Sequence, residues 1–243
     1  MSQLELAQEA EVSTRHLSYV ETGRATPSRE MVLRLADRLD VPLRERNALL
    51  VAAGFAPMYS QRGLDDPAMA AARRAVDLVL KGHEPFPALA VDRHWNLVAH
   101  NAMVPMLMAG AAPALLTPKI NVLRLSLHPE GLAPRIANLA QWRGHLLERL
   151  QQQITATGDT ELRALHEELA AYPAPGVSHD APALDAALSA IAVPFQLVTP
   201  NGLLSFISTT TIFGTPVDVT LQELAVESFF PADERTAKVL AAL

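Results

Sequence analysis

The sequence predicts an α+β protein in two parts: an all-helical N-terminal domain, then a domain built on an antiparallel sheet with covering helices. Two observations carry this prediction. Up to Leu80, apolar residues recur at the three-to-four spacing of amphipathic helices. From Phe86 the period changes, and β-rich runs follow at 88–91, 95–100, 191–198 and 203–213, the last two joined by the turn Asn201-Gly202.

Composition bounds the class of protein. A chain of 243 residues with 49% hydrophobic residues is long enough for two modest cores, and we place the domains at 1–60 and 85–243, with a connecting helix within 61–84. The chain has no cysteine, which excludes disulfides and thiolate metal sites and suits a cytoplasmic location. Its longest apolar run, 103–116, is interrupted by proline and glycine and is too short to span a bilayer, so we expect no membrane partner.

Four short helices are expected in the N-terminal domain, at 3–10, 14–22, 29–39 and 43–53. Ser13 is a good N-cap for the second helix, and Gly23 ends it. The first two helices are joined by a tight turn at Glu11 and Val12. This arrangement places the second helix in the major groove of DNA, so the domain is predicted to bind a double-stranded operator.

The candidate DNA contacts fall into two groups. Side chains on the first turn and outer face of the second helix reach base edges, whereas residues before and after that helix meet phosphates. The first group is Ser13, Thr14, Arg15 and Ser18, and the second is Gln3, Arg24 and Arg29. The net charge is −6, and the first sixty residues hold seven arginines against eight acids, so only a local basic patch is expected.

These residues resemble the Xre, or lambda-repressor-like, family. The match rests on Ser2, Gln3, Leu6, Ala7, Val12, Ser13, Ser18, Glu21, Gly23, Pro27 and Ser28. Glu11 departs from the pattern, because glycine is common at that position. Family members usually have one more helix ahead of Ser2, so we expect that the native gene product starts further upstream or that a partner chain fills the gap.

Further helices are expected after the first domain, at 65–80, 101–108, 131–153, 161–172 and 233–243. The stretch 217–228 alternates apolar residues in two halves that are one residue out of step. A single strand with a bulge near Gln222 explains this pattern, and a helix at 221–227 is the alternative.

Three segments, beginning at Asn121, Pro175 (PGVSHD) and Leu203, resemble the ligand-binding domain of MmyB-like transcription regulators. The resemblance implies a PAS-like domain, with an antiparallel sheet of about five strands that encloses an apolar cavity. It also implies a ligand-responsive transcription regulator, whose effector is a fatty acid or similar hydrophobic small molecule rather than a cofactor.

Candidate ligand contacts are apolar side chains on the strands and on the methionine-rich helix, together with donors for a lipid carboxylate. They are Phe195, Phe206, Phe213, Met103 and Met106, with His100, His128 and Arg135 as donors, and Arg124 as a further donor. Ordinary core packing explains the same apolar pattern. The eight histidines show no paired metal-ligand spacing, so no metal site is expected.

A single short recognition helix reads few base pairs, so a homodimer is expected. Two other functions stay open. The chain could be an interaction module in which the helix-turn-helix binds protein and the second domain only dimerises. It could also be an enzyme acting on a lipid, although the sequence brings together no nucleophile, base and orienting group, and we expect no catalysis.

Overall fold

The protein is described by a computed structural model that covers residues 1–173, 192–214, 216 and 218–242. It divides into two compact units. The first unit is Met1–Ala70 with Phe213–Glu223, and the second is Ala71–Ile212 with Leu224–Leu243. The PGVSHD segment, the residues expected to begin the strand at 191, and Val217 lie outside the described residues.

The first unit contains the four expected helices: α1 (Gln3–Glu9), α2 (Thr14–Glu21), α3 (Arg29–Arg38) and α4 (Leu43–Ala52). Serine caps begin the first three, because the hydroxyls of Ser2, Ser13 and Ser28 each accept a backbone N–H from the first turn. Ala7, Leu17 and Met31 form a small core between these helices. The helix-turn-helix prediction is confirmed.

Helical spacing at 43–53 predicts that Leu43, Leu49 and Leu50 face inward, and for Leu49 this prediction is wrong. Leu49 is 44% exposed, whereas Leu43 and Leu50 are buried. Residues seven apart lie on the same helix face, and Leu49 precedes Leu50 by about 100° of rotation. The buried stripe of α4 is therefore narrower than the sequence suggested.

The first unit also holds residues 213–223, which we call the β4–β5 connection, with the short helix α11 (Val219–Glu223). Its contacts with α4 are specific. The backbone N–H of Leu43 donates to Gln222 at 2.6 Å, and Arg44 donates two hydrogen bonds to the carboxylate of Glu223, at 2.6 and 2.8 Å.

A five-stranded antiparallel sheet, in the order β2-β1-β5-β4-β3, forms the second unit. The strands are β1 (Ala88–Val91), β2 (Leu97–His100), β3 (Phe195–Thr199), β4 (Gly202–Ile212) and β5 (Ala225–Pro231). The turn at Asn201 and Gly202 joins β3 to β4 as predicted, with Gly202 at φ 101°. The α+β fold with about five strands is thus confirmed.

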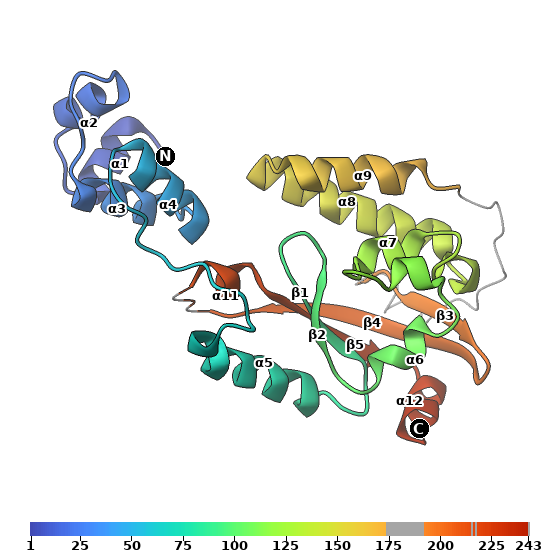
Figure 1. Ribbon diagram of the computed structural model, residues 1–243. Helices are drawn as coiled ribbons and strands as arrows, with labels where there is room; N and C mark the ends of the chain where they lie inside the picture. The colour runs from blue at the N-terminus through green and yellow to red at the C-terminus, as the bar shows by residue number, and fades with distance from the viewer. Residues whose placement is uncertain (174–191, 215, 217, 243) are drawn as a thin grey trace. The chain divides into compact units, whose positions relative to one another are not determined.

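Helices cover both faces of this sheet (Figure 1). The helices α8 (Leu139–Thr157) and α9 (Thr160–Ala171) lie with α7 (Val122–Leu127) over one face, and α5 (Ala70–Gly82) and α12 (Glu234–Ala241) over the other. The remaining elements are α6 (Val104–Met108) and the short 3-10 turns η1 (Pro67–Met69), η2 (Pro113–Leu115) and η3 (Ala133–Arg135).

Alternation along the strands builds the core on the α8 side. Side chains two apart share a face, so β1 contributes Leu89, β4 contributes Phe206, and β5 contributes both Glu227 and Phe229 to that side. On the opposite face, the backbone N–H of Ser205 is held by the hydroxyl of Thr236 in α12, at 3.0 Å. A charged residue, Glu227, thus occupies an inward position in the middle of β5.

The predicted long helix at 131–153 is wrong over residues 131–138. Residues Ala133–Arg135 form η3, and Ile136 then makes an antiparallel bridge to Leu197 of β3. Asn138 caps the edge of β3, donating to the carbonyl of Pro194 at 2.8 Å and accepting from the N–H of Gln196 at 3.3 Å. Backbone committed to a sheet edge cannot be helical, so α8 begins only at Leu139.

The single bulged strand predicted at 217–228 is also wrong. The out-of-step pattern has a different cause, because α11 ends at Glu223 and β5 begins at Ala225. The alternative helix at 221–227 matches neither element. In addition, α7 was not predicted from the sequence. Among the described residues, no helix is both long and apolar enough to cross a membrane.

Candidate functional site

The predicted base-reading residues lie at the start and on the outer face of α2. Thr14 and Arg15 are exposed, and Ser18 is half-buried. The hydroxyl of Ser13 accepts the N–H of His16 at 3.1 Å, so its first role is the helix cap. Arg15 donates from Nε to the hydroxyl of Tyr19 at 3.0 Å, which holds the guanidinium along the exposed side of the helix.

The predicted phosphate contacts surround α2. Gln3 begins α1, and its amide donates to the carboxylate of Glu21 at 2.5 Å, which ties the first helix to the end of the second. Arg24 and Arg29 are exposed, before and at the start of α3. These contacts with DNA stay predictions.

Glu11, where the resembled family commonly has glycine, lies in the turn before α2 at φ 56°. This is the left-handed region that residues with a Cβ atom adopt at a cost. The carboxylate lies 3.9 Å from Arg34, and both side chains are largely exposed, so the ion pair contributes little stability. The turn geometry itself therefore favours glycine at this position.

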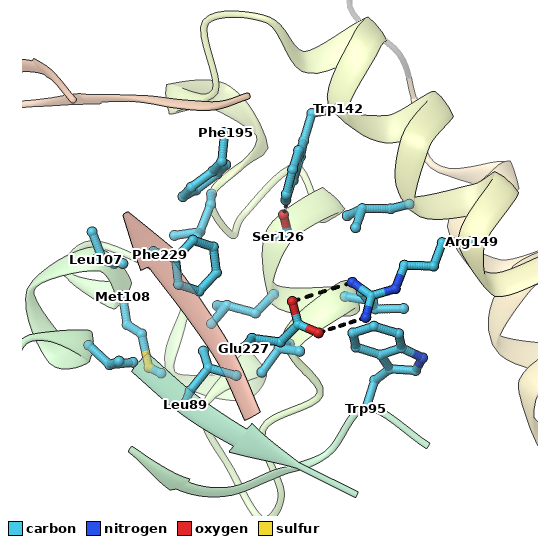
Figure 2. A pocket seen from close by; sticks show the side chains of 16 residues that line it. Leu89, Trp95, Leu107, Met108, Ser126, Trp142, Arg149, Phe195, Glu227 and Phe229 are labelled. Carbon is cyan, nitrogen blue, oxygen red and sulfur yellow. Dashed lines mark hydrogen bonds and ion pairs between the residues drawn. The ribbon is translucent and has the colours of Figure 1, made fainter. Parts of the chain in front are cut away.

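The second unit holds an apolar cavity between the sheet and α7 and α8, with a volume of about 80 Å³ (Figure 2). Its lining is almost entirely aliphatic and aromatic, with contributions from both strands and helices. The residues that line it are Leu89, Trp95, Val104, Leu107, Met108, Val122, Leu123, Leu125, Ser126, Leu132, Trp142, Leu146, Arg149, Phe195, Glu227 and Phe229.

An ion pair between Arg149 and Glu227 interrupts the apolar lining of the cavity. Arg149 of α8 donates to the two carboxylate oxygens of Glu227 on β5, at 2.7 and 3.3 Å, and Figure 2 shows the two groups facing each other. Thr210 of β4 completes the cluster, accepting from Arg149 at 2.6 Å and donating to Glu227 at 2.8 Å. The carboxylate is buried, and these bonds satisfy both of its oxygens.

Both tryptophans of the chain line the cavity. The guanidinium of Arg149 lies 4.5 Å from the ring centre of Trp95, whose N–H donates to Gln153 at 2.9 Å. Trp95 is held at φ 67°, a strained geometry for a bulky residue. The indole of Trp142 donates to the hydroxyl of Ser126 at 3.0 Å, so each indole has a fixed polar partner.

Of the predicted ligand contacts, Phe195 lines the cavity. Phe206 is fully buried beside it, with ring centres 6.1 Å apart, and Met103 and Met106 pack on the same core. Phe213 belongs to the first unit, in the β4–β5 connection. The structure therefore brings four of the five apolar candidates to one core and leaves the fifth elsewhere.

The predicted donors lie outside the cavity lining. His100 is exposed at the end of β2, and the ring of His128 packs against Tyr172. Arg135 donates to the carbonyl of Leu107 at 2.9 Å, and burial lowers its pKa. Arg124 makes two bonds of 2.6 Å to Glu168. Their roles in ligand binding stay predictions.

Sequence reasoning missed Arg149 and Glu227. Arg149 follows Trp142 by seven residues and Leu146 by three, so helical spacing puts it on the buried face of α8. Glu227 is two residues from Phe229 on a strand. A charged residue at an inward position of α8 and another at an inward position of β5 could have been recognised from the sequence. Pairing them required the tertiary fold.

No group of three or more potential metal ligands occurs in the part of the chain that the structure describes. Ser126 is the one hydroxyl among the described lining residues, and its oxygen is bonded to an indole rather than to a base. The lipid-enzyme alternative therefore gains no support from this cavity.

Comparison with known proteins gives two family matches. Residues 72–243 match the MmyB-like transcription regulator ligand binding domain, and residues 1–46 match the helix-turn-helix family. No curated protein matches the chain. A solved structure titled "Structure of an RNA-binding Light-Oxygen-Voltage Receptor" is 12% identical at a TM-score of 0.27 and covers 99% of this chain. This chain spans 57% of that one, and at such a TM-score the likeness carries no argument.

The ligand-binding match covers more than half of the chain, and it falls on the part that encloses the cavity. The helix-turn-helix match falls on the part that contains α1 and α2. The chain therefore belongs to the MmyB-like family of ligand-responsive transcription regulators, in which a DNA-binding helix-turn-helix is joined to a ligand-binding domain.

Proposed function

We propose that this protein binds a double-stranded operator as a homodimer through α2, and that a fatty acid or similar hydrophobic small molecule in the cavity changes its affinity for that operator. The PAS-like sheet supplies the wall of the cavity. One observation carries the proposal: β5 contributes Glu227 and Phe229 to the cavity, and the segment that ends at Glu223, two residues before β5 begins, belongs to the DNA-binding unit.

The β4–β5 connection provides a covalent route for the signal. It leaves the sheet after Ile212 and returns at Ala225, and these two residues are paired across the strands. Between them, Gln222 and Glu223 are bonded to the start of α4. A ligand that moves β5 therefore acts on a segment that is hydrogen-bonded to the start of α4 in the DNA-binding unit. The ligand shifts operator affinity only if it binds one conformation of the protein more tightly than the other.

The size of the cavity favours a second candidate function, an interaction module that dimerises without a ligand. A volume of about 80 Å³ is well below the ~300–1,000 Å³ of common ligand pockets. Binding of a long chain requires lining side chains to move, and Met108 is suited to this because its unbranched thioether adopts many rotamers. The two candidates differ in whether the purified protein retains or takes up a lipid.

Two measurements test the proposal on the full chain. Native mass spectrometry reports the dimer and any retained lipid. Footprinting on the chain's own upstream DNA, with and without saturated fatty acids from dodecanoic to octadecanoic acid, reports the response. We expect a protected site whose occupancy changes with the acid. Absence of binding to any promoter fragment at moderate salt would contradict the DNA-binding part, and a footprint that neither the acids nor the matching uncharged alcohols change would favour the interaction module.

A further inference from the structure

The charged groups in the cavity wall neutralise each other. Arg149 and Glu227 are the only charged side chains among the described lining residues. Two hydrogen bonds join them, and Thr210 bridges the same two groups. The cavity therefore presents a wall with charged groups but without net charge.

The guanidinium of Arg149 is already engaged at the positions that a ligand carboxylate would use. Its bidentate edge holds Glu227, and one face lies against the ring of Trp95 at 4.5 Å. The side chain of Glu227 is 6% exposed, so water screens its charge poorly. An anionic ligand would place a second carboxylate beside the first in a poorly hydrated site, where like charges repel strongly.

Arginines elsewhere in the second unit do not supply a substitute. Arg135 donates to the carbonyl of Leu107, and Arg124 is paired with Glu168. Neither side chain lines the cavity. Among the described lining residues, the structure offers no cation beyond the one that Glu227 holds.

A neutral polar group has a partner in Ser126. The hydroxyl oxygen of Ser126 accepts the indole N–H of Trp142 at 3.0 Å, and a hydroxyl can also donate its own proton. That proton suits a carbonyl or hydroxyl oxygen at the end of an apolar molecule. The rest of the lining, including Leu107, Met108 and Phe229, suits an aliphatic chain.

We infer that the cavity selects uncharged amphiphiles, meaning an aliphatic chain that ends in a hydroxyl, ketone, ester or amide, over chains that end in a carboxylate. This inference rests on the proposed ligand-binding function and narrows the chemical class of its effector. It follows from the self-neutralised pair of Arg149 and Glu227 and from the hydroxyl of Ser126.

The two tryptophans provide the readout, because both line the cavity and the chain has no others. Tryptophan fluorescence of the full chain is titrated at neutral pH with decan-1-ol and with decanoate, which share a chain length. We expect decan-1-ol to bind at least about tenfold more tightly, a factor that one unfavourable polar interaction produces.

Glu227→Gln reverses the preference if the inference is correct. The amide keeps the size of the side chain but removes its charge, which leaves Arg149 free to pair with a ligand carboxylate. We expect decanoate affinity to rise at least about tenfold, with a much smaller change for decan-1-ol. Glu168→Gln is the matched control, since it makes the same change at a carboxylate outside the cavity, and it should leave both affinities unchanged.

Ser126→Ala gives an independent test if Glu227→Gln does not fold. It should weaken decan-1-ol by about fivefold, the loss of one neutral hydrogen bond, and leave decanoate unchanged. Tighter binding of decanoate than of decan-1-ol by the native protein would overturn the inference and leave the proposed function standing. Binding of neither probe would overturn both the inference and the ligand-binding part of the proposed function.

Discussion

The two units of this protein carry function in opposite ways. In the first unit, the candidate DNA contacts are side chains on the outside of short helices, such as Thr14, Arg15 and Arg29, over a small core. In the second unit, the cavity lies within the main core and its polar groups are bonded to each other. A substitution on an exposed reading surface changes binding with little effect on folding stability, whereas a substitution in a site built into a core changes both.

The largest expected effect is on the stability of the second unit. Arg149→Met leaves the buried carboxylate of Glu227 without its cation, which typically costs about 3–5 kcal/mol. Denaturant unfolding measures the loss. In the first unit, Arg34→Met breaks the exposed pair with Glu11 and should cost less than about 1 kcal/mol. Equal losses for the two variants would break the contrast between the units.

For operator affinity, we expect the larger loss from a substitution in the first unit. Arg15→Ala removes a candidate base contact, and we expect a loss of about 1–3 kcal/mol in operator binding with little change in unfolding free energy. Arg38→Ala is a matched control, since it removes an exposed arginine near the end of α3. Gel-shift titrations at fixed salt compare the two. An undiminished affinity for Arg15→Ala would remove that residue from the interface.

The bonds that hold the β4–β5 connection on α4, within the first unit, are tested at Arg44. Arg44→Met removes the paired hydrogen bonds to Glu223 and should leave ligand affinity unchanged. The effect of the ligand on operator affinity should fall by about fivefold or more, since couplings of this kind are worth about 1–3 kcal/mol. Arg46→Met, on the same helix but bonded to Val41 and Asp37, should keep the response. A full response in Arg44→Met would rule out this route.

A smaller gain is expected at the turn before α2. Glu11→Gly relieves left-handed strain of ~1–2 kcal/mol but adds flexibility to the unfolded chain, so we expect a net rise of about 0.5–1 kcal/mol in the unfolding free energy. Asp40→Gly, at φ 49°, should gain less because aspartate tolerates this region better. Thermal melting would detect both changes, and a lower melting temperature for Glu11→Gly would contradict the strain.

Trp95 has the same backbone geometry in the second unit, at φ 67°, and the opposite outcome is expected there. Trp95→Gly removes the ring against Arg149 and the bond to Gln153, so it should destabilise the protein despite the relief of strain. We therefore expect Glu11→Gly to raise the unfolding free energy and Trp95→Gly to lower it, because only Trp95 makes side-chain contacts that outweigh its backbone strain.

The smallest effect concerns acid stability. The hydrogen bond from Arg124 holds the pKa of Glu168 below its usual value of 4.5, outweighing burial. A carboxyl whose pKa is lowered by folding stabilises the protein above the unfolded pKa, and this contribution is lost as the pH falls through the folded pKa. Glu168→Gln should therefore flatten the fall in stability below about pH 4.5. If the unfolding free energy of the variant fell with pH as steeply as that of the native protein, the Arg124–Glu168 pair would not contribute to acid stability.

The sequence by itself determined the elements whose contacts are local. The serine cap at Ser13 begins α2 as predicted, because the capping bond joins residues three apart. The turn at Asn201 and Gly202 also depends only on its own backbone, so the β3–β4 hairpin was predictable.

Only the tertiary structure decided the features that depend on distant partners. Residues near Ile136 read as helix but pair with β3, because an edge strand offers hydrogen bonds that local propensity cannot foresee. Arg149 and Glu227 are 78 positions apart, and only the packing of α8 on β5 makes them one cluster. Local patterns fix where helices and strands begin, whereas the polarity of a cavity is fixed by side chains that meet across the core.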